Sequence, residues 1–224
     1  MAEGNAAPID EADYPIAVHV RPATENRNRL TTAFRFFLAL PHIVLVGAPY
    51  ATVACISWSS DRHGWDVGGG GGLLSVVIAI ASLLAWIVLV IAARHPDALW
   101  RLSAWYLRWR VKAVAYMTLL RDEYPPFGDG EYSVELNVSK PAGHRSRLTV
   151  LFRVFLALPH LFLLSFLGVV WSFTTALAWA FILITGRYPD LLYGFALGML
   201  AWTTRVEGYV LLLRDEYPPF TLRT

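Results

Sequence analysis

The chain contains one cysteine, Cys55, so it can form neither an intrachain disulfide nor a cysteine-rich metal site. Charge is also scarce, because 16% of the 224 residues are charged, against about 25% in soluble domains. Hydrophobic residues make up 56% of the chain, and the mean hydropathy is +0.45. These shortages exclude a disulfide-stabilised secreted domain and indicate a membrane protein.

Signals for targeting and catalysis are missing as well. Residues 1–13 are acidic and polar rather than a cleaved signal peptide, and we expect a disordered tail there. The five glycines at 68–72 follow no predicted strand and precede no Gly-Lys-Ser/Thr, so they predict no phosphate-binding loop. No spacing of Ser, Asp and His is typical of a hydrolase, and we expect no enzymatic activity.

What the sequence does contain is a repeat, which decides the architecture. The nine residues LLRDEYPPF at 119–127 return unchanged at 212–220. The hexapeptide FLALPH occurs twice, ending at His42 and at His160. The chain therefore divides into a tail and two repeats: residues 1–13, 14–127 and 128–224.

The register of the repeat locates an insertion in the first copy. Residues 14–42 align with 132–160 at an offset of 118, and residues 94–127 align with 187–220 at an offset of 93. The first copy therefore holds 25 extra residues. These residues lie between His42 and Arg94, and the flexible glycine-rich loop at 57–72 is the obvious candidate for most of them.

Each repeat is expected to place a helical hairpin in the membrane, giving about four membrane segments. Residues 73–93 are uncharged and long enough to cross a bilayer, and the first arm is expected to run from about Leu30 or Phe34 to Ile56. The uncharged stretch 154–185 would be about 48 Å long as one helix, against a bilayer core of about 30 Å. We expect it to bend near 168–175 and return, with a shallow re-entrant hairpin as the alternative.

The cations predict the orientation of these segments. All of the 19 Lys and Arg residues except Arg62 lie before the first span, between the second and third, or after the fourth. By the positive-inside rule, both termini and the central segment are cytoplasmic. The rule accounts for the arginines without nucleic-acid binding. An even number of passes gives both halves one orientation, with a pseudo-twofold axis along the membrane normal.

The predicted cytoplasmic parts are a strand pair and interfacial amphipathic helices. Residues 16–20 and 134–138 alternate in polarity, and we expect these equivalent strands to pair. Arg-x-Pro-Asp at 94–97 and 187–190 predicts helix starts. In the first of these helices, aromatic and basic residues are predicted to lie at the membrane interface: Trp100, Arg101, Trp105, Arg108, Trp109 and Lys112.

The repeated tail is predicted to hold the basic start of a helix. The arginines at these starts are Arg27, Arg29 and Arg35 in the first repeat and Arg145, Arg147 and Arg153 in the second. The tail residues concerned are Arg121, Asp122, Glu123 and Tyr124 with their mates Arg214, Asp215, Glu216 and Tyr217. A partner-binding surface is the alternative interpretation. The arginine beside each acidic pair disfavours a metal site, and we expect none.

His42 and His160 are the two imidazoles within the apolar spans, and the repeat makes them mates. Each follows a proline, which frees a backbone carbonyl, so a structural role is the first interpretation. Contact with a ligand or proton is the second interpretation. Ligation of haem by both histidines is the third.

The repeated unit resembles a bacterial membrane-protein family known as domain of unknown function 4389. The motifs that carry the resemblance are RLxxxFRxFLALPH, the Arg-x-Pro-Asp turn and the RDEYPPF tail, each present twice between residues 14 and 220. The resemblance implies two tandem copies and a location in the bacterial cytoplasmic membrane. It implies no activity.

Three functions remain open at this point. The first is a mainly α-helical, multi-pass membrane protein that acts without catalysis, by binding lipid or another membrane protein and serving as a scaffold. The second is a small transporter or ligand-binding bundle with its site at the repeat interface. The third is a haem-binding electron carrier that uses His42 and His160.

Overall fold

The computed structural model describes residues 14–49, 56–59, 64–67, 71–141 and 147–223. The expected tail, Cys55 and Arg62 lie outside these residues. The described chain is mainly helical, with α1 (Arg29–Ala33), α2 (Arg35–Val46), α3 (Leu73–Ala92), α4 (Asp97–Met117), α5 (Arg147–Leu151), α6 (Arg153–Thr185) and α7 (Asp190–Val210). Its strands are β1 (Ile16–Val20), β2 (Ile56–Ser59), β3 (Gly64–Val67) and β4 (Val134–Val138).

The predicted pairing of the two equivalent strands is confirmed. β1 and β4 are antiparallel, and Val18 stands opposite Leu136 at the centre of the pair. These two residues are repeat mates, so a local twofold axis passes between them, perpendicular to the sheet. One face of the pair is buried, because Ile16, Val18 and Val134 point into the protein.

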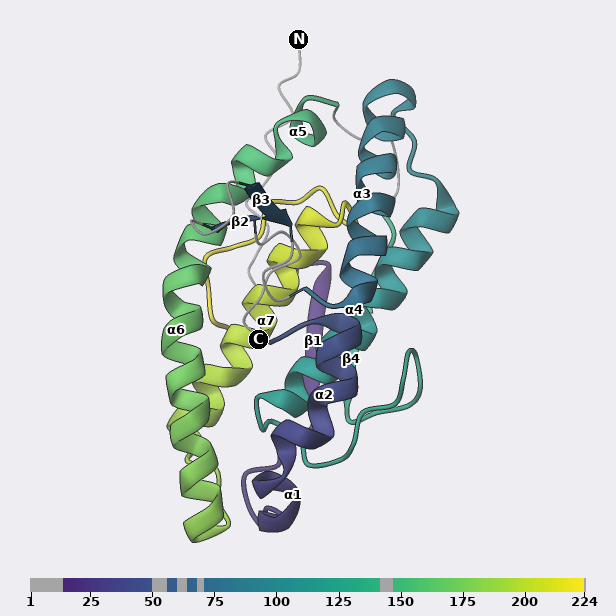
Figure 1. Ribbon diagram of the computed structural model, residues 1–224. Helices are drawn as coiled ribbons and strands as arrows, with labels where there is room; N and C mark the ends of the chain where they lie inside the picture. The colour runs from purple at the N-terminus through teal and green to yellow at the C-terminus, as the bar shows by residue number, and fades with distance from the viewer. Residues whose placement is uncertain (1–13, 50–55, 60–63, 68–70, 142–146, 224) are drawn as a thin grey trace.

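Helices α4 and α7 form the centre of the molecule beneath these strands (Figure 1). Each begins directly after a proline, with Asp97 or Asp190 in its first turn, as the Arg-x-Pro-Asp motif predicts. The two helices contact each other, and they also contact the strand pair, α7 at β1 and α4 at β4. A pair of strands is marginal in water, and this helical layer supports it.

The expected bend in the second repeat is wrong, because α6 is one uninterrupted helix of 33 residues. At a rise of about 1.5 Å per residue it is about 50 Å long. Its buried positions recur every three or four residues through the expected bend, at Gly168, Trp171 and Thr175. One stripe therefore packs inward along the whole helix, and no proline follows Pro159 within it.

The first repeat contains the same long helix in two pieces. α2 corresponds to residues 153–164 of α6, and α3 corresponds to residues 166–185. Gly72, just before α3, lies so close to the end of α2 that an added Cβ would stand 2.3 Å from the Leu45 backbone. The extra residues therefore leave the helix and return at one point, and they include the antiparallel hairpin of β2 and β3. We call α2 plus α3, and α6, the two rods.

The rods run antiparallel along the two sides of the molecule (Figure 1). α1, at the start of the first rod, packs against the end of α6, where Trp179 Nε1 donates to the Thr32 carbonyl at 2.9 Å. The equivalent contact joins α5 to α3, where Trp86 Nε1 donates to the Val150 carbonyl at 2.9 Å. Each rod therefore starts where the other ends.

Two described helices, α3 and α6, are long and apolar enough to cross a membrane. Four such segments, arranged as two hairpins, are not found in the described part of the chain. The four-segment prediction is therefore not confirmed, and α6 forms one helix where the second hairpin was expected. The expectation of an even number of membrane crossings in each repeat depended on these hairpins, so the structure no longer supports it.

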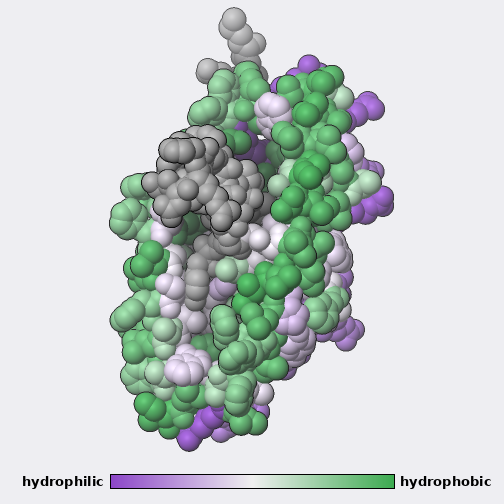
Figure 2. Space-filling view, viewed as in Figure 1, coloured by the Kyte–Doolittle hydropathy of each residue, from purple (hydrophilic) through white to green (hydrophobic). Residues whose placement is uncertain are grey.

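Both rods turn large apolar side chains outward (Figure 2). Phe155, Phe166 and Phe173 of α6 are 66–71% exposed, and Leu73 and Ile91 of α3 are exposed to a similar extent. Exposed apolar surface of this extent marks a site of contact with a membrane or another protein.

Candidate functional site

The tail after α4 holds the arginine at the start of the first rod. Arg35 Nη2 lies 2.5 Å from Asp122 Oδ1, and Nη1 donates to the carbonyl oxygens of Tyr116, at 3.0 Å, and Arg121. The guanidinium also lies over the Tyr116 ring, 4.3 Å from its centroid. Arg27 adds a second ion pair to Asp122 at 2.9 Å. Charge pairing and cation–π contact together fix Arg35.

The second repeat builds the same arrangement with its own residues. Arg153 pairs with Asp215, donates to the Tyr209 carbonyl at 3.2 Å and lies 4.5 Å from the centroid of the Tyr209 ring. Arg35 and Arg153 are both buried. The predicted contact between each tail and the basic start of a helix is therefore confirmed for Asp122 and Asp215.

The tail glutamates have different partners from the aspartates. Glu123 and Glu216 each lie 2.5 Å from the arginine of their own tail, Arg121 and Arg214. The hydrogen bond from Ser133, and then Arg121, hold the pKa of Glu123 below its usual range. Burial works to raise the pKa of Glu216, but hydrogen bonds led by that from Arg214 outweigh it and leave this pKa lowered.

These tail arginines also tie the rods to the strands. Arg121 Nη1 donates to the Arg21 carbonyl after β1 at 2.8 Å, and Arg214 Nη1 donates to the Ser139 carbonyl after β4 at 2.9 Å. Each tail therefore contacts both a rod and the strand pair, through residues that are adjacent in the sequence.

His42 and His160 each lie in a box of aromatic side chains from their own repeat. Trp109 Nε1 donates to His42 Nδ1 at 3.2 Å, and the imidazole stacks on Phe127 with a centroid distance of 4.7 Å. Tyr124 closes the box at 5.1 Å. The mate of this box surrounds His160 with the equivalent residues Trp202, Tyr217 and Phe220.

The hydrogen bond from tryptophan determines what each histidine can do. Because Nδ1 accepts this hydrogen bond through its lone pair, the neutral ring carries its own hydrogen on Nε2. In both boxes this Nε2 is buried near a tail proline, Pro125 or Pro218, but outside regular hydrogen-bond geometry. Neither ring nitrogen then offers a free lone pair to iron. The structure places His42 and His160 in separate boxes and does not bring them together.

The predicted interfacial face of α4 is wrong for three of its six residues. Trp100, Trp109 and Lys112 are buried, and Lys112 Nζ donates to the Gly130 carbonyl at 2.5 Å. α4 packs on α2 and α3 as well as on α7 and β4, so no broad face remains for lipid. Arg101 is exposed, and the other two, Trp105 and Arg108, are partly exposed.

Between α4 and α7 lies an ion pair that the sequence analysis missed. Arg110 Nε donates to both carboxylate oxygens of Glu207, at 2.9 and 3.0 Å, and both residues are buried. Arg110 also donates to the carbonyl oxygens of Val46, at 2.5 Å, and Ala48, at 3.3 Å, beyond the end of α2. Burial raises the pKa of Glu207, and the charge and hydrogen bonds of Arg110 reverse only part of this rise. At about 100° per residue, Arg110 lies on the opposite side of α4 from Arg101, Arg108 and Lys112. A charge on that apolar side is the sequence signal that could have revealed the pair.

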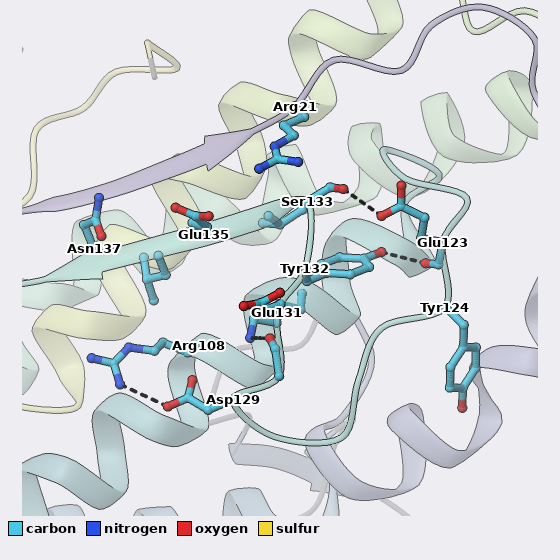
Figure 3. A pocket seen from close by; sticks show the side chains of 14 residues that line it. Arg21, Arg108, Glu123, Tyr124, Asp129, Glu131, Tyr132, Ser133, Glu135 and Asn137 are labelled. Carbon is cyan, nitrogen blue, oxygen red and sulfur yellow. Dashed lines mark hydrogen bonds and ion pairs between the residues drawn. The ribbon is translucent and has the colours of Figure 1, made fainter.

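A polar cavity of about 750 Å³ opens beside β4 (Figure 3). Its walls carry the carboxylates of Asp129, Glu131 and Glu135 together with the cations Arg21 and Arg108. One ion pair, Arg108 with Asp129 at 3.3 Å, spans part of the wall. Mixed charge on an open cavity suits a polar protein surface better than a small apolar ligand.

Comparison with known proteins places this architecture in one family. The family model described as Domain of unknown function (DUF4389) matches residues 71–128 and 147–221, more than half of the chain. No curated protein matches the chain. No solved structure matches it either.

Proposed function

This chain belongs to the family described as Domain of unknown function (DUF4389), and we propose that it is a non-enzymatic membrane scaffold. One side of the molecule, formed by the two rods, binds lipid. The opposite side, with the strand pair and the polar cavity, faces the cytoplasm and binds a protein partner.

The outward apolar surface of the rods is the observation that carries this proposal. It covers α2 from Phe36 onward, α3, and α6 from Val154 to Ile184, and none of these three helical stretches contains a charged residue. At about 25 cal/mol per Å², exposure of such a surface to water is costly, whereas contact with hydrocarbon removes this cost.

The charges at the ends of the rods support a flat orientation in the membrane. Arg29 and Arg187 are exposed at one end of the pair of rods, and Arg94 and Arg147 at the other. Rods that crossed the bilayer would place exposed arginines on both sides, against the positive-inside rule. Rods that lie in the interface place all four on one side and put the pseudo-twofold axis along the membrane normal. Their length also exceeds the bilayer core of about 30 Å.

The side that carries the strands supports the second half of the proposal. His19, Glu135 and Asn137 are exposed there, next to the polar cavity. Arg121 and Arg214 fix both strands to the tails. A rigid polar platform of this kind suits recognition of another protein.

Labelling of single cysteines tests the orientation. In a Cys55→Ser background, Arg94→Cys and Arg187→Cys place one thiol at each end of the rods. In sealed right-side-out and inverted vesicles, we expect a membrane-impermeant maleimide to label both thiols from the cytoplasmic side. Phe166→Cys, on the lipid-facing side, is the matched control and stays unlabelled. Labelling of the two ends from opposite sides would overturn the flat orientation, and recovery of the protein in the soluble fraction would overturn the membrane location.

A further inference from the structure

Two apolar grooves lie between the rods, one in each half of the pseudo-symmetric structure. The larger, of about 490 Å³, lies between α2 and α6 over Leu119, and the smaller, of about 320 Å³, lies between α3 and α6 over Leu212. Among the described residues, all seven that line the smaller groove are repeat mates of residues that line the larger. The fold therefore forms the same groove twice from equivalent residues.

The walls of both grooves join the exposed apolar surface of the rods. Phe36 and Trp179 line the larger groove, and Leu83 and Val154 line the smaller, and all four are 41–65% exposed. A hydrocarbon chain can therefore enter from the membrane without crossing water. Both volumes also fall in the range of about 300–1,000 Å³ that is usual for ligand pockets.

One arginine nitrogen in each groove has no hydrogen-bond partner among the described residues. Arg35 and Arg153 line the two grooves and are 3% and 2% exposed, and the Nε of each is buried without a hydrogen bond. Nη2 of each already pairs with Asp122 or Asp215, and Nη1 of each donates to the carbonyl oxygen of Tyr116 or Tyr209. Since an unpaired buried donor is costly, an oxygen acceptor on the groove's occupant would satisfy it.

We propose that each groove binds one acyl chain of a glycerophospholipid from the surrounding bilayer, with an ester or phosphate oxygen of that lipid accepting from the Nε of Arg35 or Arg153. This inference rests on the membrane location proposed above. The apolar walls select the hydrocarbon, and the buried arginine selects a lipid with an oxygen acceptor at the head of its chain. Two lipids, related by the same twofold axis as the repeats, complete the gap between the rods.

The test fills each groove and counts the lipids retained. Ala176→Phe fills the larger groove and Ser82→Phe fills the smaller, whereas Leu177→Phe changes the next residue of α6, outside both grooves. The full chain is extracted in mild detergent, and phospholipid per chain is measured by mass spectrometry. We expect two lipids in the wild type and in Leu177→Phe, one in each filled variant, and none in the double variant.

A second measurement requires no added bulk. The wild-type protein is placed in phosphatidylcholine and phosphatidylglycerol nanodiscs whose acyl chains carry bromine, which quenches nearby tryptophan. Trp86→Phe and Trp179→Phe should each remove a strongly quenched fraction of the fluorescence. Unchanged lipid counts in the filled variants, together with unquenched Trp86 and Trp179 in a membrane-bound protein, would overturn the groove assignment alone. A protein that does not enter bilayers would overturn the proposed function as well.

Discussion

The buried ion pair between α4 and α7 yields a prediction that can be measured directly. Valine stands in the first repeat, as Val114, at the position equivalent to Glu207. Glu207→Val therefore copies a residue that this fold already accepts there. The substitution leaves Arg110 buried, with a side chain only 2% exposed and its carboxylate partner removed.

The magnitude follows from what Arg110 retains. Removing one partner of a buried pair costs about 3–5 kcal/mol. The carbonyl oxygens of Val46 and Ala48 still accept from Arg110, so we expect a loss near the lower limit, about 3 kcal/mol. The double variant Arg110→Leu/Glu207→Val removes both charges and should recover at least half of that loss, because an apolar pair of similar volume replaces them.

Reversible unfolding in mixed detergent micelles, titrated with dodecyl sulfate and followed by tryptophan fluorescence, gives the free energy of unfolding. Asp129→Asn is the matched control, since its pair with Arg108 is 34% and 44% exposed and should contribute under about 1 kcal/mol. If Glu207→Val were as mild as this control, or if the double variant were less stable than the single one, the reasoning about the buried pair would be refuted.

Three further predictions follow from other parts of the structure. Because the pKa values of Glu123 and Glu216 are lowered from 4.5 in the folded protein, their stabilisation is present above that pH and is lost as the pH falls through the folded values. The melting temperature should therefore drop in acid, and less so in the Gln variants; an equal drop in both would contradict this. Nitrogen-15 NMR should find His42 and His160 neutral, with the proton on Nε2, and a proton on Nδ1 would contradict the hydrogen bonds from tryptophan. Deletion of residues 48–72 should join α2 and α3 into one helix and keep the native circular dichroism, whereas deleting two residues fewer rotates α3 by about 200° and should destabilise the protein; equal stability of the two deletions would contradict a continuous rod.

The features that could be predicted correctly from the sequence are those that follow from the internal repeat. It located equivalent strands, equivalent helix starts and the pairing of Asp122 and Asp215 with arginine, because internal repeats constrain which segments occupy equivalent places. The structure agrees with each of these. Local motifs such as Pro-Asp at a helix start act over a few residues, so a single sequence can reveal them.

The bend predicted within the apolar stretch 154–185 is wrong, and the length of that stretch is the reason for the error. A bend was inferred because one helix would exceed the thickness of a bilayer, an argument that assumes the helix crosses it. The 25 extra residues in the first repeat suggest the turn of a hairpin, whereas α6 shows the same helix without an interruption. Which interpretation holds depends on packing along α7, which no local pattern records.

The character of α4 was hidden for a similar reason. Tryptophan and arginine side by side are typical of a membrane interface, but they also suit a helix surrounded by carbonyl oxygens and carboxylates. Glu207, the partner of Arg110, lies 97 residues away in the sequence. Nothing in the sequence near Arg110 indicates that contact.

The strand pair has a consequence for any chain that carries this unit only once. β1 meets β4 with mates facing each other across Val18 and Leu136, so each strand is complementary to a copy of itself. An isolated unit would leave the edge of its strand unpaired and the apolar face of that strand exposed to water. Two such chains would close that gap by forming a symmetric homodimer, and the tandem chain amounts to that dimer with its subunits joined end to end.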